Sequence, residues 1–244
     1  MPRDDYIGVL DHGYVRLIDF MGSDLSVVRS ARVSHNADWR SGNDTGSDER
    51  LINYMMKNEH MTPFESCVAT FEIQAPIFVV RQWHRHRTQS YNEISARYTE
   101  LPELFYEPDP AIIGTQDTKN KQGRVIEGSD SLKPERDMRP SLDLYTQSCQ
   151  ASFETYRQLL GEGWPRELAR SVLPFATYTR MFATTNLRNW MAFMTLREDL
   201  HAQYEIRVYA EAVDAMLTKH FQVSMMAWAR KHPAAVSGDG GTAG

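Results

Sequence analysis

The strand-like segments of this chain do not alternate regularly with its helical segments, and this order limits the fold more than any other feature. Two short strands between Ile7 and Phe20, around the turn Asp11-His12-Gly13, predict a β-hairpin. Further strands are expected at 67–73, which alternates, and at 177–185, which is rich in β-branched and aromatic residues. Because a regular βαβ order is absent, we predict an α+β fold with central mixed or antiparallel strands flanked by helices. The expected helices cover residues 23–33, 47 to about 60, 77–87, 142–160, 165–173, 187–196 and 203–221.

Composition indicates an ordinary globular chain. It has 244 residues, of which 41% are hydrophobic, and a chain of this size buries a substantial core. We expect a single domain over residues 1–235, with a mobile polar loop at 117–136 and a flexible tail at 236–244. No apolar run reaches the length of a membrane span, and no apolar segment follows the first residues as in a signal peptide. We therefore expect no action at a membrane. Since two cysteines are too few for a disulfide framework, we also expect a cytoplasmic protein.

The arginine residues are concentrated in two windows of an otherwise acidic chain. The net charge is −5, which argues against a nucleic-acid-binding protein. Residues 81–98 carry +3, residues 166–197 carry +4, and the remainder of the chain therefore carries −12. A guanidinium group binds phosphate or carboxylate through two parallel hydrogen bonds. The windows are either solvated surfaces with ion pairs or sites for an anionic ligand, and charge alone leaves both interpretations open.

Residues 85–98 hold an unusual density of side chains that can form hydrogen bonds, twelve of fourteen. Burying such a segment is costly unless every group has a partner, so folding alone does not account for it. On the expected helix, Gln82, Arg85 and His86 lie at positions i, i+3 and i+4 and share one face. Together with the hydroxyl, amide and carboxylate groups that follow, these residues suit a nucleotide with a phosphate and a polar ring edge.

The same segment carries a recognisable pattern. Arg85-His86-Arg87-x-x-Ser90-x-Asn92-Glu93-x-Ser95-x-Arg97 matches, at every fixed position, the R-H-R-x-x-S-x-N-E-x-S-x-R signature of flavin-dependent thymidylate synthases. Four further segments resemble that family: H-x-T-P-F-E at 60–65, A-R-x-V-L-P at 169–174, N-x-R at 186–188 and L-R-x-x-x-H-A-Q-x-E at 196–205. The resemblance extends over residues 7–221.

This resemblance implies a homotetramer, with active sites shared between subunits, that converts dUMP to thymidylate. It implies 5,10-methylenetetrahydrofolate as the carbon donor, FAD as the hydride donor and NADPH as the reductant of the flavin. The implied catalytic residue is Arg197, which can stabilise negative charge as the uracil ring loses a proton. The implied dUMP contacts are Gln82, Trp83, His84, Arg85, Glu93, Ile94, Ser95, Ala96, Arg97, Arg170 and Arg197. The implied FAD contacts are His60, Thr62, Arg85, His86, Arg87, Thr88, Glu93, Asn186, Leu187, Arg188, Ala192 and His201.

One position departs from the family pattern. Ala192 stands where the family often has Asn, so we keep it as a position beside the flavin but not as a hydrogen-bond donor. Cys67 and Cys149 have no Arg or His within three residues, so we expect both in the core rather than as nucleophiles. Ser95 has no histidine near it in the sequence and is interpreted as a binding hydroxyl.

Two other classes of function remain. A metal-dependent hydrolase would use His84, His86 and His201, but histidines two apart on a helix point in different directions, so we expect no metal. A non-catalytic nucleotide-binding protein would keep the arginines and lose the groups that face the ring. The presence of Glu93, Ser95 and Arg197 favours the enzyme.

Overall fold

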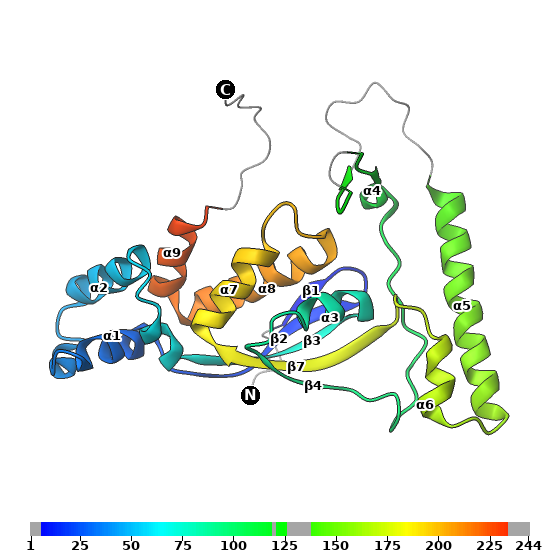
Figure 1. Cartoon of the computed structure of the whole chain (residues 1–244), viewed down its shortest axis with the longest axis horizontal. Helices are drawn as coiled ribbons and strands as arrows, with labels where there is room; N and C mark the ends of the chain where they lie inside the picture. Colours follow the sequence, from blue (N-terminus) through cyan, green and yellow to red (C-terminus); the bar gives the residue numbers. More distant parts are fainter. Residues whose placement is uncertain (1–5, 119–120, 126–137, 234–244) are drawn as a thin grey trace.

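The computed structural model describes residues 6–118, 121–125 and 138–233. At its centre is a five-stranded sheet with the order β1-β2-β3-β7-β4, in which every neighbouring pair is antiparallel. This sheet, covered by helices (Figure 1), confirms the predicted α+β fold. A separate ladder joins β5 and β6. The strands are β1 Tyr6–Val9, β2 Gly13–Met21, β3 Val68–Pro76, β4 Ser90–Glu93, β5 Thr115–Gln116, β6 Arg124–Val125 and β7 Tyr178–Asn186.

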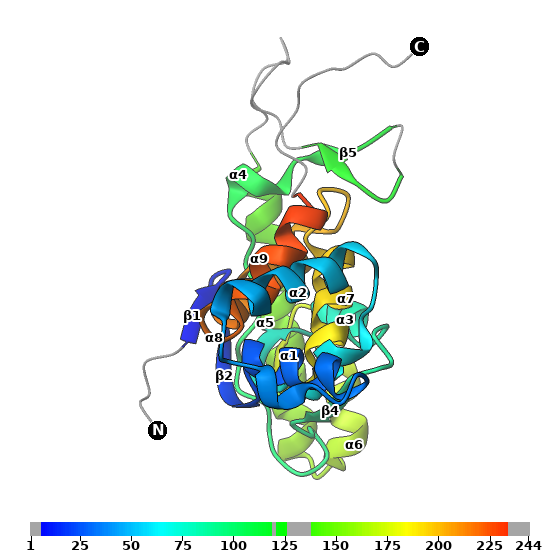
Figure 2. The ribbon, with the colours of Figure 1, turned by 90° about the vertical axis from the view of Figure 1, so that its left-hand side faces the viewer.

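Helices surround the sheet on one face and at both ends (Figure 1). α3, α7 and α8 cover one face, and α5 and α6 lie beyond one end. Figure 2 shows the opposite end, where α1, α2 and α9 lie together. The α-helices are α1 Asp24–Val33, α2 Thr45–Lys57, α3 Ile77–Trp83, α4 Pro110–Ile113, α5 Arg139–Gly161, α6 Arg166–Ala169, α7 Leu187–Arg197, α8 Tyr204–His220 and α9 Gln222–Lys231. The 3-10 turns are η1 Asp38–Arg40, η2 Thr62–Ser66 and η3 Arg170–Val172.

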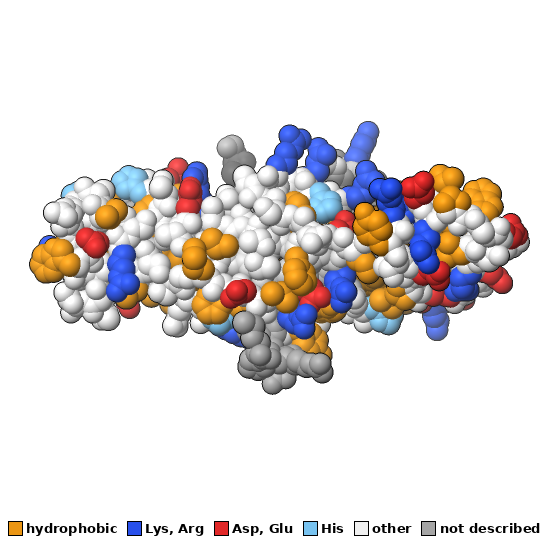
Figure 3. Space-filling model, turned by 90° about the horizontal axis from the view of Figure 1, so that it is seen from below, with side chains coloured by type: hydrophobic (Ala, Val, Ile, Leu, Met, Phe, Trp, Pro, Cys, Tyr) orange, Lys and Arg blue, Asp and Glu red, His pale blue; other side chains and the backbone are white. Residues whose placement is uncertain are grey.

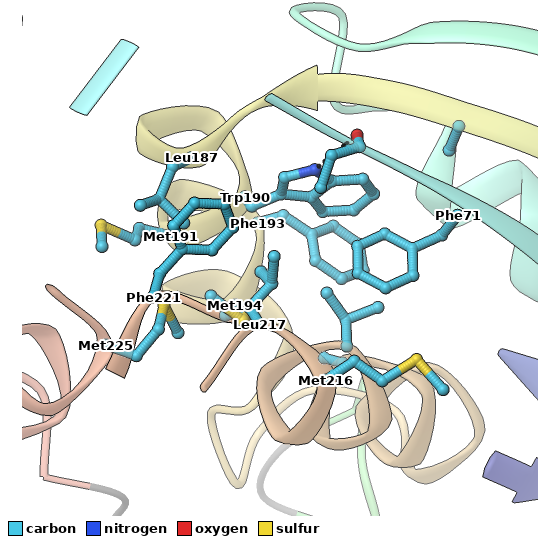
Figure 4. Close-up of a cluster of buried hydrophobic side chains, with 14 of the residues drawn as sticks. Phe71, Leu187, Trp190, Met191, Phe193, Met194, Met216, Leu217, Phe221 and Met225 are labelled. Atoms are coloured by element: carbon cyan, nitrogen blue, oxygen red, sulfur yellow. Dashed lines mark hydrogen bonds between the residues drawn. The ribbon is translucent and has the colours of Figure 1, made fainter. Parts of the chain in front are cut away.

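The main hydrophobic core lies between the sheet and the helices α7 and α8 (Figure 4). Phe71 of β3 and Trp190 of α7 meet edge to face, with ring centroids 5.0 Å apart. The indole Nε1 of Trp190 also donates to the main-chain oxygen of Ala69 at 3.1 Å. Burying one large apolar side chain contributes about 1.5–3 kcal/mol relative to exposing it. This packing therefore holds α7 firmly and fixes the residues at both of its ends.

A second, smaller hydrophobic cluster holds α5 and α6 in place. Phe105 and Phe153 stack in it, with ring centroids 6.1 Å apart. Figure 3 views the molecule from the side of the sheet opposite α7 and α8, and Lys and Arg side chains gather over the half that carries α5 and α6. The buried members of the cluster are Phe105, Cys149, Phe153, Tyr156, Ala169 and Ala176.

The β1–β2 hairpin, predicted around Asp11-His12-Gly13, is confirmed and lies against α8. At Gly13 there is no room for a side chain, because a Cβ atom there would overlap the hydroxyl group of Tyr209. That hydroxyl donates to the main-chain oxygen of Gln74 at 2.7 Å. At Gly8, on the other strand of the hairpin, a Cβ atom would meet nothing within 4 Å.

Several boundaries differ from those expected. α2 begins at Thr45 rather than at Ser47, because Asp44 caps it by accepting a hydrogen bond from the Ser47 N–H at 3.0 Å. The helix expected at 165–173 is too long, since α6 gives way to the turn η3. β4 and α9 were not predicted.

Some predictions fall on parts of the chain that the structure does not cover. The predicted mobile loop 117–136 is described only at 117–118 and 121–125, and the tail 236–244 lies outside the described residues. Their mobility and the domain bounds of 1–235 therefore stay predictions. None of the described helices is long and apolar enough to cross a membrane.

Candidate active site

The segment after α3 is a tight turn rather than a continuation of the helix. α3 ends at Trp83, although the sequence predicts a longer helix. The cause is non-local, because the Tyr91 hydroxyl on β4 shares its one proton between the main-chain oxygens of Trp83 and His86, at 3.0 and 2.8 Å. Carbonyl groups at a helix end need such partners. Gln82, Arg85 and His86 therefore do not share a helix face, and that prediction is wrong.

Arg197, the last residue of α7, is held against this turn. Its Nε donates to Nε2 of His86 at 2.9 Å, and its Nη2 donates to the main-chain oxygen of Gln82 at 3.1 Å. These contacts join residues 111 and 115 positions apart in the sequence. We call Gln82, His86 and Arg197 the inner cluster. In it, one residue expected at dUMP, one expected at FAD and the expected catalytic residue meet.

The protonation state of His86 follows from this geometry. Burial, and then the positive charge of Arg197, lower the pKa of His86 to about 4. The imidazole is therefore neutral at neutral pH, and because Nε2 accepts from Arg197, its proton is on Nδ1. Burial also lowers the pKa of Arg197, although a guanidinium group keeps its charge in proteins. The result is a fixed cation, suited to stabilising negative charge on a ligand.

β4 leads from the inner cluster along the edge of the sheet. Oε1 of Glu93 accepts a hydrogen bond from Thr179 Oγ1 at 2.7 Å. The Ile94 N–H donates to a main-chain oxygen of β7 at 2.9 Å. The Oγ of Ser95 accepts from the Arg97 N–H at 3.3 Å. The residues expected at dUMP between 93 and 97 are thus anchored in order, with a hydroxyl and a carboxylate at fixed places.

Arg97 and Arg170, here called the outer pair, lie on the surface beside α6. Nη2 of Arg97 is 3.3 Å from Oε2 of Glu167, and these side chains are 55% and 54% exposed. Arg170, three positions after Glu167, is exposed and forms no ion pair with any described residue. The outer pair is therefore accessible to an anionic ligand.

Five of the residues expected at FAD, Leu187 among them, lie around η2 and the start of α7. An ion pair between Glu65 and Arg188 joins these two elements. Asn186 caps α7, its Oδ1 accepting from a main-chain N–H at 2.9 Å. His60 and Thr62 are exposed just before η2 and at its first residue. We call this area the η2 region.

Comparison with known proteins shows a similarity that extends over most of the chain. The family described as "Thymidylate synthase complementing protein" matches residues 16–221. A protein from Thermotoga neapolitana named flavin-dependent thymidylate synthase is 45% identical over 207 residues, which are 85% of this chain and 86% of that protein. This chain belongs to the flavin-dependent thymidylate synthase family.

Further relatives share most of the chain. A flavin-dependent thymidylate synthase from Ehrlichia ruminantium is 45% identical over 211 residues, which are 86% of this chain and 68% of that protein. The crystal structure of the UMP/dUMP methylase PolB from Streptomyces cacaoi, bound with 5-Br dUMP, matches with a TM-score of 0.80 and 37% identity. It covers 92% of this chain and 97% of that chain.

The groups that a flavin-dependent thymidylate synthase would offer to FAD fit an anionic dinucleotide. Arg85 and Arg87 are exposed and form no ion pair with any described residue, so they are available to phosphate groups. The main-chain oxygen of Thr88 is already bound by Thr185 Oγ1 at 3.0 Å. Ala192 is exposed on α7, and the exposed ring of His201 contacts Asp199 at 2.8 Å.

Three of the expected contacts are limited by burial. The side chains of Trp83 and Leu187 are 0% and 1% exposed, and Ala96 is also buried. Trp83 is thus a core residue, its Nε1 donating to Gln89 Oε1 at 3.0 Å. Trp83 and Leu187 are buried as whole residues, main chain included, so their contacts with a ligand of a flavin-dependent thymidylate synthase stay predictions, as does that of Ala96.

The two cysteines considered as nucleophiles, and His84 considered as a metal ligand, are not part of the inner cluster. Cys67 and Cys149 are buried, as predicted, and burial raises the pKa of both thiols, which opposes a thiolate nucleophile. His84 packs against Tyr91 with ring centroids 4.6 Å apart, away from the contacts of His86 and His201. Within the described ranges, no three His, Cys, Asp or Glu side chains are placed to hold a metal ion.

Sequence analysis assigned no role to Gln203 and Glu205, although both are fixed positions of the segment 196–205 that resembles the family. Gln203 and Glu205 connect to Gln82 through hydrogen bonds. The sequence carried a signal for the burial of Glu205. This residue lies on the apolar stripe of its helix that includes Tyr209, Ala212 and Met216, and it extends that stripe to the start of the helix. A carboxylate on such a stripe is buried and needs partners.

Proposed function

We propose that this chain catalyses the reductive methylation of dUMP to thymidylate. The carbon comes from 5,10-methylenetetrahydrofolate, and NADPH reduces the bound flavin. The enzyme is a cytoplasmic homotetramer that shares active sites between subunits. The neighbour named a UMP/dUMP methylase also exists as a structure with 5-Br UMP, so UMP is the second candidate substrate.

The observation that carries the proposal is the fixed position of Arg197. Carbon 5 of uracil becomes nucleophilic only when the ring gains electron density. A guanidinium group held by His86 and Gln82 can stabilise the negative charge as the ring loses its N3 proton. Because His86 is neutral, it adds no second positive charge and keeps the Arg197 fork oriented. This route requires no thiolate, which agrees with the burial of both cysteines.

The other site residues bind and orient the nucleotide and FAD. Arg97 and Arg170 supply the charge for the nucleotide phosphate, and Glu93 and Ser95 contact the remainder of the nucleotide. Arg85, Arg87 and Arg188 supply the charge for the phosphates of FAD, with His60, Thr62, Thr88 and Asn186 beside it. FAD, when bound and reduced, supplies the hydride that completes the methyl group.

The arrangement of these groups supports active sites shared between subunits. The η2 region adjoins the end of the sheet where Val68 pairs with Asn186, whereas the outer pair adjoins the end where Pro76 pairs with Tyr178. β7, nine residues long, separates these ends by about 26 Å. Hydride transfer requires flavin and pyrimidine in contact. A second subunit that brings its own η2 region near the outer pair satisfies that requirement.

The test begins with the purified protein. It should be yellow, bleach with NADPH, and melt at a higher temperature with added FAD, because a ligand at a hundredfold excess over Kd stabilises by roughly 2.7 kcal/mol. Product analysis with dUMP, and separately with UMP, identifies the substrate. A colourless protein without a thermal shift in FAD contradicts the flavin chemistry and favours a non-catalytic nucleotide-binding protein.

A further inference from the structure

A chain of hydrogen bonds leads from a buried carboxylate to Gln82 of the inner cluster. Glu205, in the first turn of α8, is 2% exposed. Its Oε1 accepts from Arg124 Nη2 at 2.9 Å and from the Tyr106 hydroxyl at 3.3 Å. Its Oε2 accepts from Nε2 of Gln203 at 2.8 Å. Oε1 of Gln203 in turn accepts from Nε2 of Gln82.

The charge on Glu205 sets the direction of every bond in this chain. An ionised carboxylate only accepts hydrogen bonds. The Tyr106 hydroxyl stays a donor, because burial and then the charge of Glu205 raise its pKa. Gln203 must therefore turn its amide nitrogen toward Glu205 and its oxygen toward Gln82. Gln82 must turn its nitrogen inward, which leaves its own Oε1 for a ligand.

A buried carboxylate is costly unless it is paired and hydrogen-bonded. At Glu205 the cost is offset by Arg124, by Tyr106 and by the N-terminal end of the α8 dipole. An apolar residue would continue the helix stripe without that cost. Packing therefore does not explain why a carboxylate stands at this position, whereas its hydrogen-bond connection to Gln82 does.

We propose that Glu205 is a positioning residue. Through Gln203 it orients Gln82, so that Gln82 offers a hydrogen-bond acceptor to an N–H or O–H group of the pyrimidine nucleotide. It also steadies the residue whose main-chain oxygen holds Arg197. The inference rests on the proposed function for the identity of the ligand, but the orientation of the amides can be measured without it.

The first experiment reverses the hydrogen-bond direction and measures thermal unfolding. Gln82→Glu places a carboxylate against the oxygen of Gln203, so we expect Tm to fall by roughly 2–4 °C, as for the loss of one hydrogen bond in a chain of this size. Adding Glu205→Gln frees Gln203 to turn and donate to the new carboxylate. We expect Tm of the double variant to recover, although Glu205→Gln alone lowers it.

The matched control is Glu211→Gln, an exposed position on the same helix. It removes the same charge without touching the hydrogen-bond chain. It should not rescue Gln82→Glu. Rescue by Glu211→Gln to the same extent, or no rescue by Glu205→Gln, overturns the proposal, since charge balance or packing would then explain the data.

The second experiment measures nucleotide affinity in the FAD-loaded enzyme. Gln203→Leu changes an exposed residue and leaves Glu205 with Arg124 and Tyr106. We expect the Kd for dUMP to rise about tenfold, equivalent to one hydrogen bond, with flavin content and reduction by NADPH unchanged. Glu205→Gln should give the same rise, and the double variant no more than either.

Two negative outcomes are distinguishable. An unchanged Kd in Gln203→Leu, with only a lower Tm in Glu205→Gln, makes Glu205 a structural partner of Arg124 and overturns the proposal. A wild-type protein that binds neither FAD nor dUMP contradicts the proposed function instead. In that case the thermal series still decides how the amides are oriented.

Discussion

The inner cluster and the outer pair are both arginine sites, yet the chain prepares them differently. Arg197 is half-buried and donates two hydrogen bonds within its own chain. Arg97 has one exposed ion pair, and Arg170 has none among the described residues. Exposed pairs contribute only ~0–1 kcal/mol, so a ligand displaces that contact easily. In the proposed function, orientation is built in where charge must be stabilised on a ring, whereas a phosphate requires only accessible cations.

The largest effect on activity is expected when the side chain at position 197 keeps its positive charge but loses its fixed orientation in the inner cluster. In Arg197→Lys, a single ammonium cannot reproduce the planar fork that contacts both His86 and Gln82. We expect transfer to dUMP to fall by two or more orders of magnitude at saturating dUMP, roughly the 3–4 kcal/mol lost with a preorganised group. Stopped-flow measurement of the half-reactions should show normal flavin reduction by NADPH and slow reoxidation. Near-normal reoxidation would leave Arg197 as a binding residue only.

At the outer pair, removing charge should affect binding rather than turnover. For Arg170→Ala we expect the KM for dUMP to rise roughly tenfold or more, since a charge-assisted hydrogen bond contributes about 1.5–3 kcal/mol, with kcat little changed. Steady-state kinetics check this. Arg166→Ala, on the same short segment but paired with Glu100 at 3.5 Å, is the control and should leave KM unchanged. A drop in kcat equal to that of Arg197→Lys would erase the distinction between the two sites.

A smaller effect concerns acid stability, and it belongs to the inner cluster alone. The folded pKa of His86 is lowered to about 4, against roughly 6.5 in an unfolded chain. Between these values the unfolded state binds more protons, so His86 makes the protein lose stability as the pH falls through this window. In His86→Gln, which cannot titrate, Tm should fall less between pH 6.5 and pH 4 than in the wild type. Parallel melting curves for the two proteins would refute the assigned neutral state.

The smallest effect is expected at the cysteines, one in each hydrophobic cluster. Cys67→Ala and Cys149→Ala remove buried sulfur atoms without touching either arginine site. We expect thymidylate formation to be retained and Tm to fall slightly, in line with a small cavity. A folded variant that has lost turnover would revive a cysteine nucleophile.

Local signals in the sequence predicted the hairpin and the position of α1. The turn at Asp11-His12-Gly13 and the start of the helix expected at 23–33 need only neighbouring residues, and both are present in the structure. The end of α3 could not be predicted, because it depends on the Tyr91 hydroxyl that β4 brings back to it. β4 itself has a single aromatic residue, Tyr91, among polar ones, and becomes a strand because the edge of β7 offers it partners.

The two arginine-rich windows indicated only part of the charge distribution around the site, because many partners of their arginines lie elsewhere in the sequence. In the window 166–197, Arg166, Arg180 and Arg188 pair with Glu100, Glu72 and Glu65, all of which lie outside the window. A count along the sequence cannot include partners that the fold supplies. The family motifs identified Arg197 and His86, and the wider resemblance added Gln82, each one by itself. Their contact with each other, and the support from Gln203, appears only when α7 and α8 are packed against the sheet.

The lack of space for a side chain at Gly13 limits which substitutions this sequence can accept. Any residue larger than glycine there would displace the Tyr209 hydroxyl from Gln74 and push α8, whose first turn carries Glu205. Gly8, in the same hairpin, faces open space and carries no such restriction. In a library of functional variants, position 8 should accept many residues and position 13 almost none. Selection that preserves the site would thus also act on the hairpin turn at Gly13.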